Sequence, residues 1–173
     1  RIAPNKRQED VIRAFYDYKK FYNPKSRLIL VGGHNGMERY YHRLKSYINA
    51  LELEDVVFPG HIKFDEILAY YKIADVFLCQ SEHEGFCVPL VEAMYFKIPV
   101  IAYNSSAVGE TLGKGGILLN EKNALETAAL MDKILKDKGL QKKIIANQNE
   151  RLDDFAHDKI LARFNELLRE NVL

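Results

Sequence analysis

The chain has 173 residues, of which 47% are hydrophobic and 28% are charged, and its 25 Lys and Arg residues against 24 Asp and Glu residues leave a net charge of +1. These values indicate one folded domain, residues 1–173, and they exclude a polybasic nucleic-acid binder and a disordered acidic tail. The 2 cysteines cannot form a disulfide scaffold or a four-thiolate zinc site, so we expect a reducing, cytoplasmic location. No stretch approaches the ~20 apolar residues of a membrane helix. Because the sequence begins at Arg1 without Met, we expect a fragment of a longer protein.

Short apolar runs that end in turn residues alternate with segments of helical period as far as Leu119. Strands are predicted at residues 27–31, 56–58, 75–79, 98–103 and 117–119. Apolar residues at helical spacing precede the first strand and separate the next strands. They are Val11, Phe15, Tyr18 and Tyr22 before the first strand, Met37, Tyr40, Leu44, Tyr47 and Leu51 before the second, and Ile67, Leu68 and Tyr71 before the third. A fourth helix is predicted from Pro89 to about Phe96 and a short one at 108–112, and helices alone follow at 124–136, 140–152 and 159–172.

This alternation predicts a doubly wound α/β domain, a Rossmann-like arrangement in which helices cover both faces of a mostly parallel sheet. The last three helices form an all-helical tail, which we expect to pack on the sheet. Ligands of open parallel sheets bind at the carboxyl ends of the strands. The loops that follow the strands are therefore where we expect the chemistry of this domain.

The loop after the third predicted strand, residues 81–89, carries the richest pattern and leads into a helix that contains Glu92. Gly85 would allow a tight turn and a close approach to a ligand. Glu92 lies one turn into the helix and leans back toward its start, so its carboxylate and that of Glu84 are predicted to accept hydrogen bonds from sugar or ribose hydroxyls. The N–H groups that we expect to be free at the helix start, where they would bind an anion, belong to Cys87, Val88, Leu90 and Val91.

Each of these features also has an ordinary structural interpretation. A Glu in the first turn of a helix commonly serves only the helix dipole, and a Gly-Phe pair in a loop is commonly a turn with a core aromatic. Residues 82–84, Glu-His-Glu, could also be a metal cluster. We expect no metal here, because alternating side chains in a short loop diverge and the chain has no Asp-x-Asp pair.

Two cations, Arg1 and Lys6, precede the first helix, where they could bracket a diphosphate, although a solvated basic turn is the simpler interpretation of an isolated pair. The glycine-rich run 32–36 is similar to a phosphate loop but lacks the spacing of a dinucleotide or Walker motif. The turn at Gly60, His61 and Ile62 could receive a flat base through its backbone, although His61 could equally be an exposed turn residue.

These motifs occur in the order of a known family. Residues 1–6, 60–63, 74–81, 84–94, 99–102 and Glu110 resemble the carboxyl-terminal, donor-binding domain of the retaining glycosyltransferases of family 4, which have the two-domain GT-B fold. The resemblance implies that Arg1 and Lys6 bind the donor diphosphate and that Glu84 contacts hydroxyls of the donor sugar, so these three are the expected catalytic residues.

The resemblance further implies that Glu92 holds the ribose. The backbone positions that it places against the sugar, the phosphate and the base are Gly85, Phe86, Cys87, Val88, His61 and Ile62.

The activity implied is transfer of a hexosyl group from a UDP-sugar or GDP-sugar to an acceptor hydroxyl with retention of anomeric configuration, without a metal or a further cofactor. The acceptor, a glycan or a lipid-linked sugar, would bind an amino-terminal domain outside this chain, so we expect the isolated chain to be inactive. The intact enzyme could associate peripherally with the inner face of the membrane. Two alternatives stay open, a nucleotide-sugar 2-epimerase of the same fold and a non-catalytic nucleotide-sugar-binding module.

Overall fold

A computed structural model describes the backbone of residues 1–172 and the side chains of residues 1–170. All five predicted strands are present. The fifth has its predicted bounds, the second extends further, and the other three begin later than predicted. They are β1 (Leu28–Val31), β2 (Val56–Gly60), β3 (Phe77–Cys79), β4 (Val100–Tyr103) and β5 (Ile117–Leu119). The helices of the first part of the chain are the 3-10 turn η1 (Pro4–Lys6), α1 (Gln8–Phe21), α2 (Glu38–Ala50), α3 (Phe64–Ile73), α4 (Val88–Tyr95) and α5 (Val108–Leu112). The last three are α6 (Ala124–Lys136), α7 (Lys138–Asp153) and α8 (His157–Val172).

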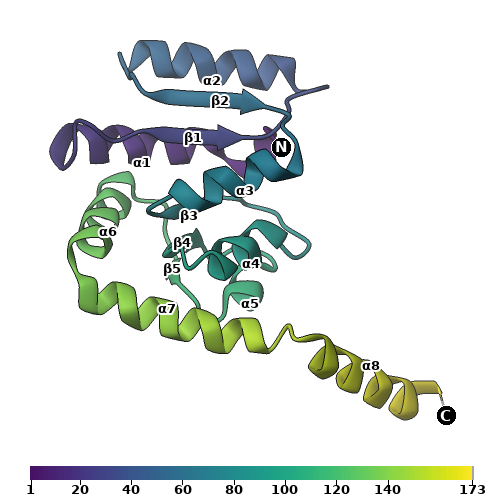
Figure 1. The fold of residues 1–173 in the computed structure, drawn as a ribbon. Coiled ribbons are helices and arrows are strands. Elements are labelled where there is room, and N and C mark those ends of the chain that lie inside the picture. Colours follow the sequence, from purple (N-terminus) through teal and green to yellow (C-terminus); the bar gives the residue numbers. More distant parts are fainter. Residues whose placement is uncertain (173) are drawn as a thin grey trace.

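Every strand pair in the described residues is parallel, as the βα alternation predicts, but the pairs form two sheets rather than one. β1 pairs with β2, and β4 lies between β3 and β5 (Figure 1). The segment before α1 joins the two sheets. The N–H of Ile2 donates to the carbonyl of Gly33 beyond β1 (2.9 Å), and the N–H of Glu82 beyond β3 donates to the carbonyl of Asn5 (2.9 Å).

Helices cover both faces of the β3–β5 sheet, which confirms the doubly wound class. Successive residues of β4 point to opposite faces. Val100 and Ala102 pack into one core cluster with residues of α4 and α5, whereas Ile101 packs into another with Ile134 of α6 and Ile144 of α7. The parallel strand β4 is thus buried on both sides, and for this reason its sequence is a continuous apolar run.

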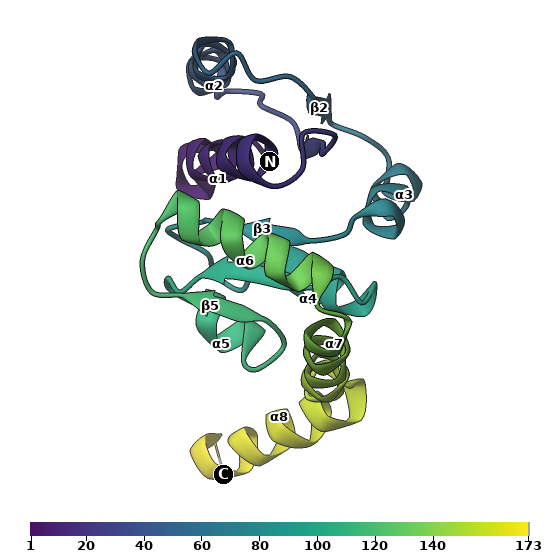
Figure 2. The same ribbon diagram turned by 90° about the vertical axis from the view of Figure 1, so that its left-hand side faces the viewer.

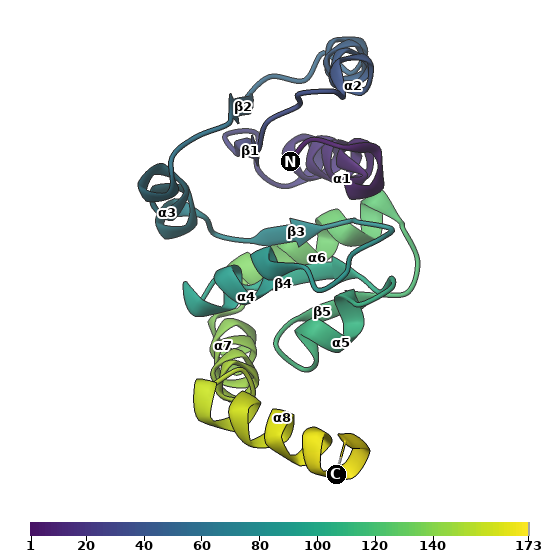
Figure 3. The same ribbon diagram turned by 90° about the vertical axis from the view of Figure 1, so that its right-hand side faces the viewer.

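The β1–β2 sheet has α1 and α2 on one face and α3 on the other (Figures 2 and 3). The predicted stripes of α1 and α2 lie largely in a third core cluster that includes Phe15, Tyr40 and Leu44. α1 also packs against α6, so the two sheets share a helical layer (Figure 2). The prediction for α3 was only partly right, because Ile67, Leu68 and Tyr71 are half-buried and no residue of this helix is fully buried.

The helical tail was predicted to pack on the sheet, which is right for α6 and α7 and wrong for α8. α6 covers the β3–β5 sheet, and α7 packs against both α4 and α6. α8 projects from the end of α7, away from both sheets (Figure 1), and its apolar side chains Ile160, Leu161 and Phe164 are exposed. Helical periodicity shows which face of a helix is apolar, but it does not show whether this chain supplies a surface for that face. Within residues 1–172, each helix is too short or too polar to cross a bilayer.

Candidate donor-binding site

The loops that follow β1, β2, β3 and β4 meet at one edge of the domain. The N–H of Gly32, beyond β1, donates to the carbonyl of Gly60 at the end of β2 (3.1 Å). The loop after β3 is held by the loop after β4, because the Ser105 hydroxyl donates to the carbonyl of Ser81 (2.5 Å) and the N–H of Glu84 donates to the Ser106 hydroxyl (2.8 Å). The structure therefore assembles at this edge the strand-end loops that the sequence indicated.

Lys6 and Glu84, which are 78 positions apart, form an ion pair at the centre of this edge. The Lys6 ammonium lies 2.6 and 2.7 Å from the two carboxylate oxygens. The carboxylate is buried, with only 8% of the Glu84 side chain exposed, whereas 29% of the Lys6 side chain is exposed. The lysine is therefore still accessible to an anionic ligand, while the carboxylate beside it is held in place. A cation next to a fixed carboxylate suits a ligand that carries an anionic group next to hydroxyl groups.

The protonation state of Glu84 depends on its partners. Burial alone would raise the pKa of its carboxyl group, but hydrogen bonds from Lys6 and Ser81 outweigh burial and hold the pKa below its ordinary value. The side chain is therefore a carboxylate near neutral pH and accepts hydrogen bonds only.

The turn into α4 is formed differently from the prediction. The left-handed backbone conformation belongs to Cys87 (φ 69°), at the N-cap of α4, while Gly85 has no positive φ and an added Cβ there would meet no atom within 4 Å. The described residues therefore give no steric reason for a glycine at position 85. The N–H of Leu90 was predicted to be free, but it donates to the carbonyl of Cys87 (2.9 Å).

The side chains around the start of α4 differ in exposure. Val88 is exposed, whereas Cys87 is buried. Phe86 is half exposed, and its ring packs edge-on against Phe155 with 5.6 Å between the centroids. Its carbonyl accepts a hydrogen bond from the Thr111 hydroxyl (2.5 Å). This hydrogen bond from α5 fixes the backbone of the loop. The start of α4 lies beside Glu84, at the edge of the sheet where the site was predicted.

Glu92 lies on α4, and its carboxylate accepts a hydrogen bond from the Tyr71 hydroxyl of α3 (2.8 Å). Burial, and secondly this carboxylate, raise the pKa of Tyr71, so the phenol is a donor throughout the physiological range. One Glu92 oxygen takes this bond, and a carboxylate has lone pairs for further donors. Tyr71 was predicted only as a member of the apolar stripe of α3, because helical spacing gives no sign that its hydroxyl reaches a carboxylate on another helix.

Arg1, His61 and the glycine run after β1 lie together. A Cβ at Gly33 would meet Cβ of His61 at 3.5 Å, and a Cβ at Gly32 would lie 2.5 Å from the backbone nitrogen of Arg1. Gly32 has φ 140°, a conformation that side-chain-bearing residues rarely adopt. Gly32 is thus required for the close approach of Arg1 to β1. The side chains of Arg1 and His61 are exposed, and Ile62 is half-buried.

This close approach gives a stability prediction with a matched control. Gly36→Ala replaces another positive-φ glycine (φ 76°) whose added Cβ would meet nothing within 4 Å, so it should lower the free energy of unfolding by about 1–2 kcal/mol. Gly32→Ala adds a collision with the Arg1 backbone and should cost more than about 3 kcal/mol. Urea unfolding of both variants measures the difference, and equal losses would contradict the proposed role of the close approach.

A charged network borders the Lys6–Glu84 pair. Lys122 donates to Asp10 (2.9 Å) and to Glu82 (3.0 Å), and Arg7 pairs with the same two carboxylates. Burial would raise the pKa of Asp10, but hydrogen bonds from Arg7 and Lys122 outweigh it and lower the pKa. Lys122 was not predicted as a site residue, although it follows β5 and the convergence of strand ends would have indicated it.

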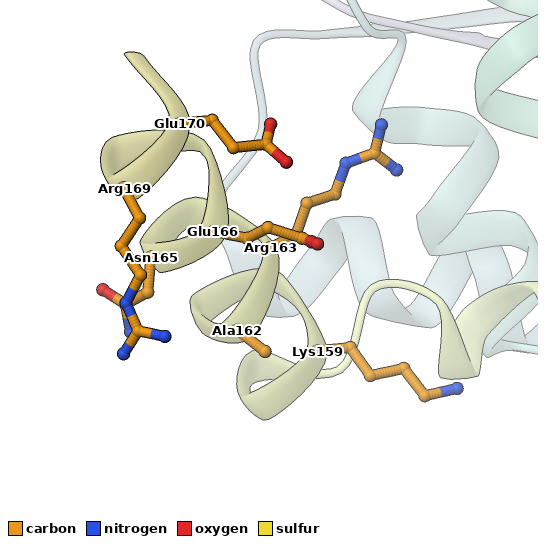
Figure 4. A pocket seen from close by; sticks show the side chains of 7 residues that line it. All are labelled: Lys159, Ala162, Arg163, Asn165, Glu166, Arg169 and Glu170. Atoms are coloured by element: carbon orange, nitrogen blue, oxygen red, sulfur yellow. The ribbon is translucent and has the colours of Figure 1, made fainter. Parts of the chain in front are cut away.

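Two hollows lie outside the Lys6–Glu84 pair, and the second is lined in part by Asp10 and Lys122 of the charged network. One is lined by residues of α8 alone and lies on the charged face of that helix (Figure 4). Its lining residues are Lys159, Ala162, Arg163, Asn165, Glu166, Arg169 and Glu170. The other, of about 70 Å³, lies between α1 and the start of α6 beside the buried Gln80, and it is large enough only for a few water molecules. Neither contains Lys6, Glu84 or Glu92.

The fold and the site together define a parallel α/β domain with a lysine, two carboxylates and a helix start at the carboxyl edge of its strands. The chain belongs to the glycosyl transferases of group 1, the family that matches residues 1–151. The alpha-monoglucosyldiacylglycerol synthase of Acholeplasma laidlawii is 32% identical over 134 residues, which are 72% of this chain and 31% of the synthase.

Solved structures agree with this family. Alr3699/HepE of Anabaena, in complex with UDP and glucose, superposes with a TM-score of 0.84 at 27% identity over 98% of this chain and 46% of HepE. The carboxyl-terminal domain of LpcC, a group 1 family glycosyl transferase of Francisella tularensis, has a TM-score of 0.74 at 26% identity over 88% of this chain and 80% of that domain. The present chain thus has the fold of the carboxyl-terminal half of a GT-B glycosyltransferase. It spans about a third or less of the length of its curated relatives.

Proposed function

We propose that this domain binds a nucleoside diphosphate sugar and, together with an acceptor-binding domain, transfers the hexosyl group to an acceptor hydroxyl with retention of anomeric configuration. The observation that carries the proposal is the Lys6–Glu84 pair beside the start of α4. It combines a cation for the diphosphate with a carboxylate for sugar hydroxyls, and a simple structural ion pair would not need to lie at the ligand-binding edge of the sheet.

Each residue has a defined task in this proposal. Departure of the nucleoside diphosphate leaves negative charge on phosphate oxygens, which Lys6, Arg1 and the backbone N–H groups at Cys87 and Val88 stabilise without a metal. Glu84 orients the hexose through its hydroxyls. The backbone of Gly85 and Phe86 lies against the sugar and the phosphate.

The nucleoside occupies the other side of the same edge. Glu92, held by Tyr71, accepts hydrogen bonds from the ribose hydroxyls, and the backbone at His61 and Ile62 receives the base. HepE has been solved with UDP and with UDP-glucose, which supports a UDP-sugar as the donor here, with a GDP-sugar as the alternative. The acceptor, a glycan or a lipid-linked sugar, binds outside this domain, so donor binding is the activity expected of the isolated chain.

A thermal-shift and calorimetric titration with UDP, GDP and ADP tests the proposal. A ligand at 100 times its dissociation constant stabilises the folded state by about 2.7 kcal/mol, which should raise Tm by several degrees for a domain of this size. We expect UDP to give the largest shift. No shift and no heat with any of the three nucleotides at millimolar concentration would overturn the assignment of a donor site.

A further inference from the structure

Two cysteines and the site carboxylate lie together beneath the candidate donor loop, residues 80–86. The sulfur atoms of Cys79 and Cys87 and a carboxylate oxygen of Glu84 all lie within 4.8 Å of one another. Cys79 ends β3 and Cys87 is the N-cap of α4, so the two thiols stand at the two ends of the loop that carries Glu84. Both thiols are free and buried, each with 7% of the residue exposed.

Three ligand atoms of this kind would suit a soft metal ion such as Zn²⁺. The position that a metal would need on Glu84 is already taken, because the Lys6 ammonium lies 2.6 and 2.7 Å from its two oxygens. A metal would have to displace this cation from a buried carboxylate. Reaction between the two thiols requires no such displacement.

The thiols are unequal, which favours a reaction between them. A hydrogen bond from the Cys87 thiol lowers the pKa of Cys79 against the opposing effect of burial, and the same contact raises the pKa of Cys87. The Ser81 hydroxyl lies 3.5 Å from the Cys79 sulfur and gives it a second polar neighbour. A thiolate beside a protonated thiol is the arrangement of an attacking and a resolving cysteine.

We propose that Cys79 and Cys87 form a reversible disulfide that closes the donor loop and weakens nucleotide binding. The effect on binding rests on the donor site proposed above, whereas disulfide formation does not. A disulfide requires the sulfurs to approach to about 2.05 Å. This approach pulls on the N-cap of α4, where Cys87 already has φ 69°, and on the thiol contacts of Glu84. The disulfide would therefore displace both the N–H groups at the start of α4 and the Glu84 carboxylate, which are the groups proposed to hold the donor.

The oxidant is a low-molecular-weight disulfide such as oxidised glutathione. Because Cys79 is buried, this step requires a local opening of the donor loop. The exposed Cys79 thiolate then attacks one glutathione sulfur, the glutathione S–S bond breaks, and one glutathione thiolate leaves. Cys87 then loses its proton and attacks the Cys79 sulfur, which forms the protein disulfide and expels the second glutathione thiolate. Both thiolates take up the protons released by the two cysteines. Two protein thiols are thus oxidised and one glutathione disulfide is reduced to two thiols.

Intact-mass measurement after equilibration in graded ratios of reduced and oxidised glutathione tests the first part. Because the chain has only 2 cysteines, an internal disulfide appears as the loss of two hydrogen atoms, reversed by dithiothreitol. Cys79→Ser and Cys87→Ser should each stop at a single glutathione adduct or remain unmodified. A covalent dimer, or a chain that keeps both thiols at ratios that oxidise ordinary vicinal dithiols, would overturn the proposal.

Calorimetry with UDP on the reduced and the oxidised chain tests the second part. We expect the oxidised chain to bind UDP about tenfold more weakly, within the usual range of coupling between two sites. The double variant Cys79→Ser with Cys87→Ser, which has no thiol that an oxidant could modify, should show the same UDP affinity before and after the oxidant. Equal affinities of the two wild-type forms would overturn the switch, whereas a reduced chain that binds no nucleotide would contradict the donor site and leave the disulfide to the mass measurement.

Discussion

Lys6→Ala should lower the affinity of the domain for UDP by about thirtyfold or more. Loss of one partner from a close, desolvated charge contact costs about 2–5 kcal/mol, and each ~1.4 kcal/mol is a tenfold change in affinity. Inorganic pyrophosphate should lose affinity to a similar degree, because the lysine is proposed to contact the diphosphate rather than the nucleoside. Calorimetric titration of both ligands measures the two losses. Lys136→Ala, which removes an exposed lysine paired with Asp132 on α6, is the matched control and should change neither affinity.

The same substitution has a structural effect that must be separated from binding. Without Lys6 the buried carboxylate of Glu84 lacks its cation, which should lower the free energy of unfolding by about 1–3 kcal/mol. The double variant Lys6→Ala with Glu84→Ala removes both charges and should recover most of this stability. Its UDP affinity should stay as low as that of the single variant. Recovery of UDP affinity together with stability would show that Lys6 serves the fold and would contradict its proposed contact with the diphosphate.

The sequence predicted the strands and helices well because most of these elements are determined by local pattern. Each strand is a short apolar run closed by turn residues, and β5 and α6 have the predicted bounds. The exposed position of α8 could not be predicted, since an amphipathic stripe such as Ile160 and Phe164 has the same sequence whether or not another surface covers it. The division into two sheets was missed for a related reason, because alternation gives the order of elements but not which strands pair.

The candidate site was predictable to the extent that strand ends converge in a parallel sheet. That rule placed Lys6, Glu84 and Glu92 at one edge, and the resemblance assigned their tasks. The residues of the protein that hold these side chains and the donor loop in place could be identified only from the three-dimensional structure. Tyr71 reaches Glu92 from another helix, and Ser105 and Ser106 hold the donor loop from the loop after β4. The left-handed conformation of Cys87 could not be predicted, because residues with a side chain rarely adopt it and the tight turn was assigned to Gly85.

Glu92→Gln should weaken UDP binding by about ten- to a hundredfold while leaving the binding of inorganic pyrophosphate unchanged. Hydrogen bonds to a charged acceptor contribute about 1.5–3 kcal/mol, and the amide keeps the shape of the side chain but loses its charge. Pyrophosphate has no ribose, so it should not detect the substitution. Tyr71→Phe is the companion variant, because the ring keeps its stacking on Phe96 (5.3 Å between centroids) and only the hydroxyl that positions Glu92 is lost. Its UDP affinity should fall by less than that of Glu92→Gln.

Comparing UDP with a nucleotide that lacks the ribose hydroxyls, on the wild-type domain and on Glu92→Gln, gives a thermodynamic cycle. The 2′,3′-dideoxy form of UDP should bind the wild-type domain more weakly than UDP does. The variant should prefer UDP by a smaller factor than the wild type does, because its amide keeps an acceptor oxygen but has no charge. Calorimetry on the four combinations gives the coupling energy between the carboxylate and the hydroxyls. If the two losses add fully, so that the variant still prefers UDP by the wild-type factor, Glu92 does not contact the ribose, and its bond to Tyr71 is then a purely structural link between α3 and α4.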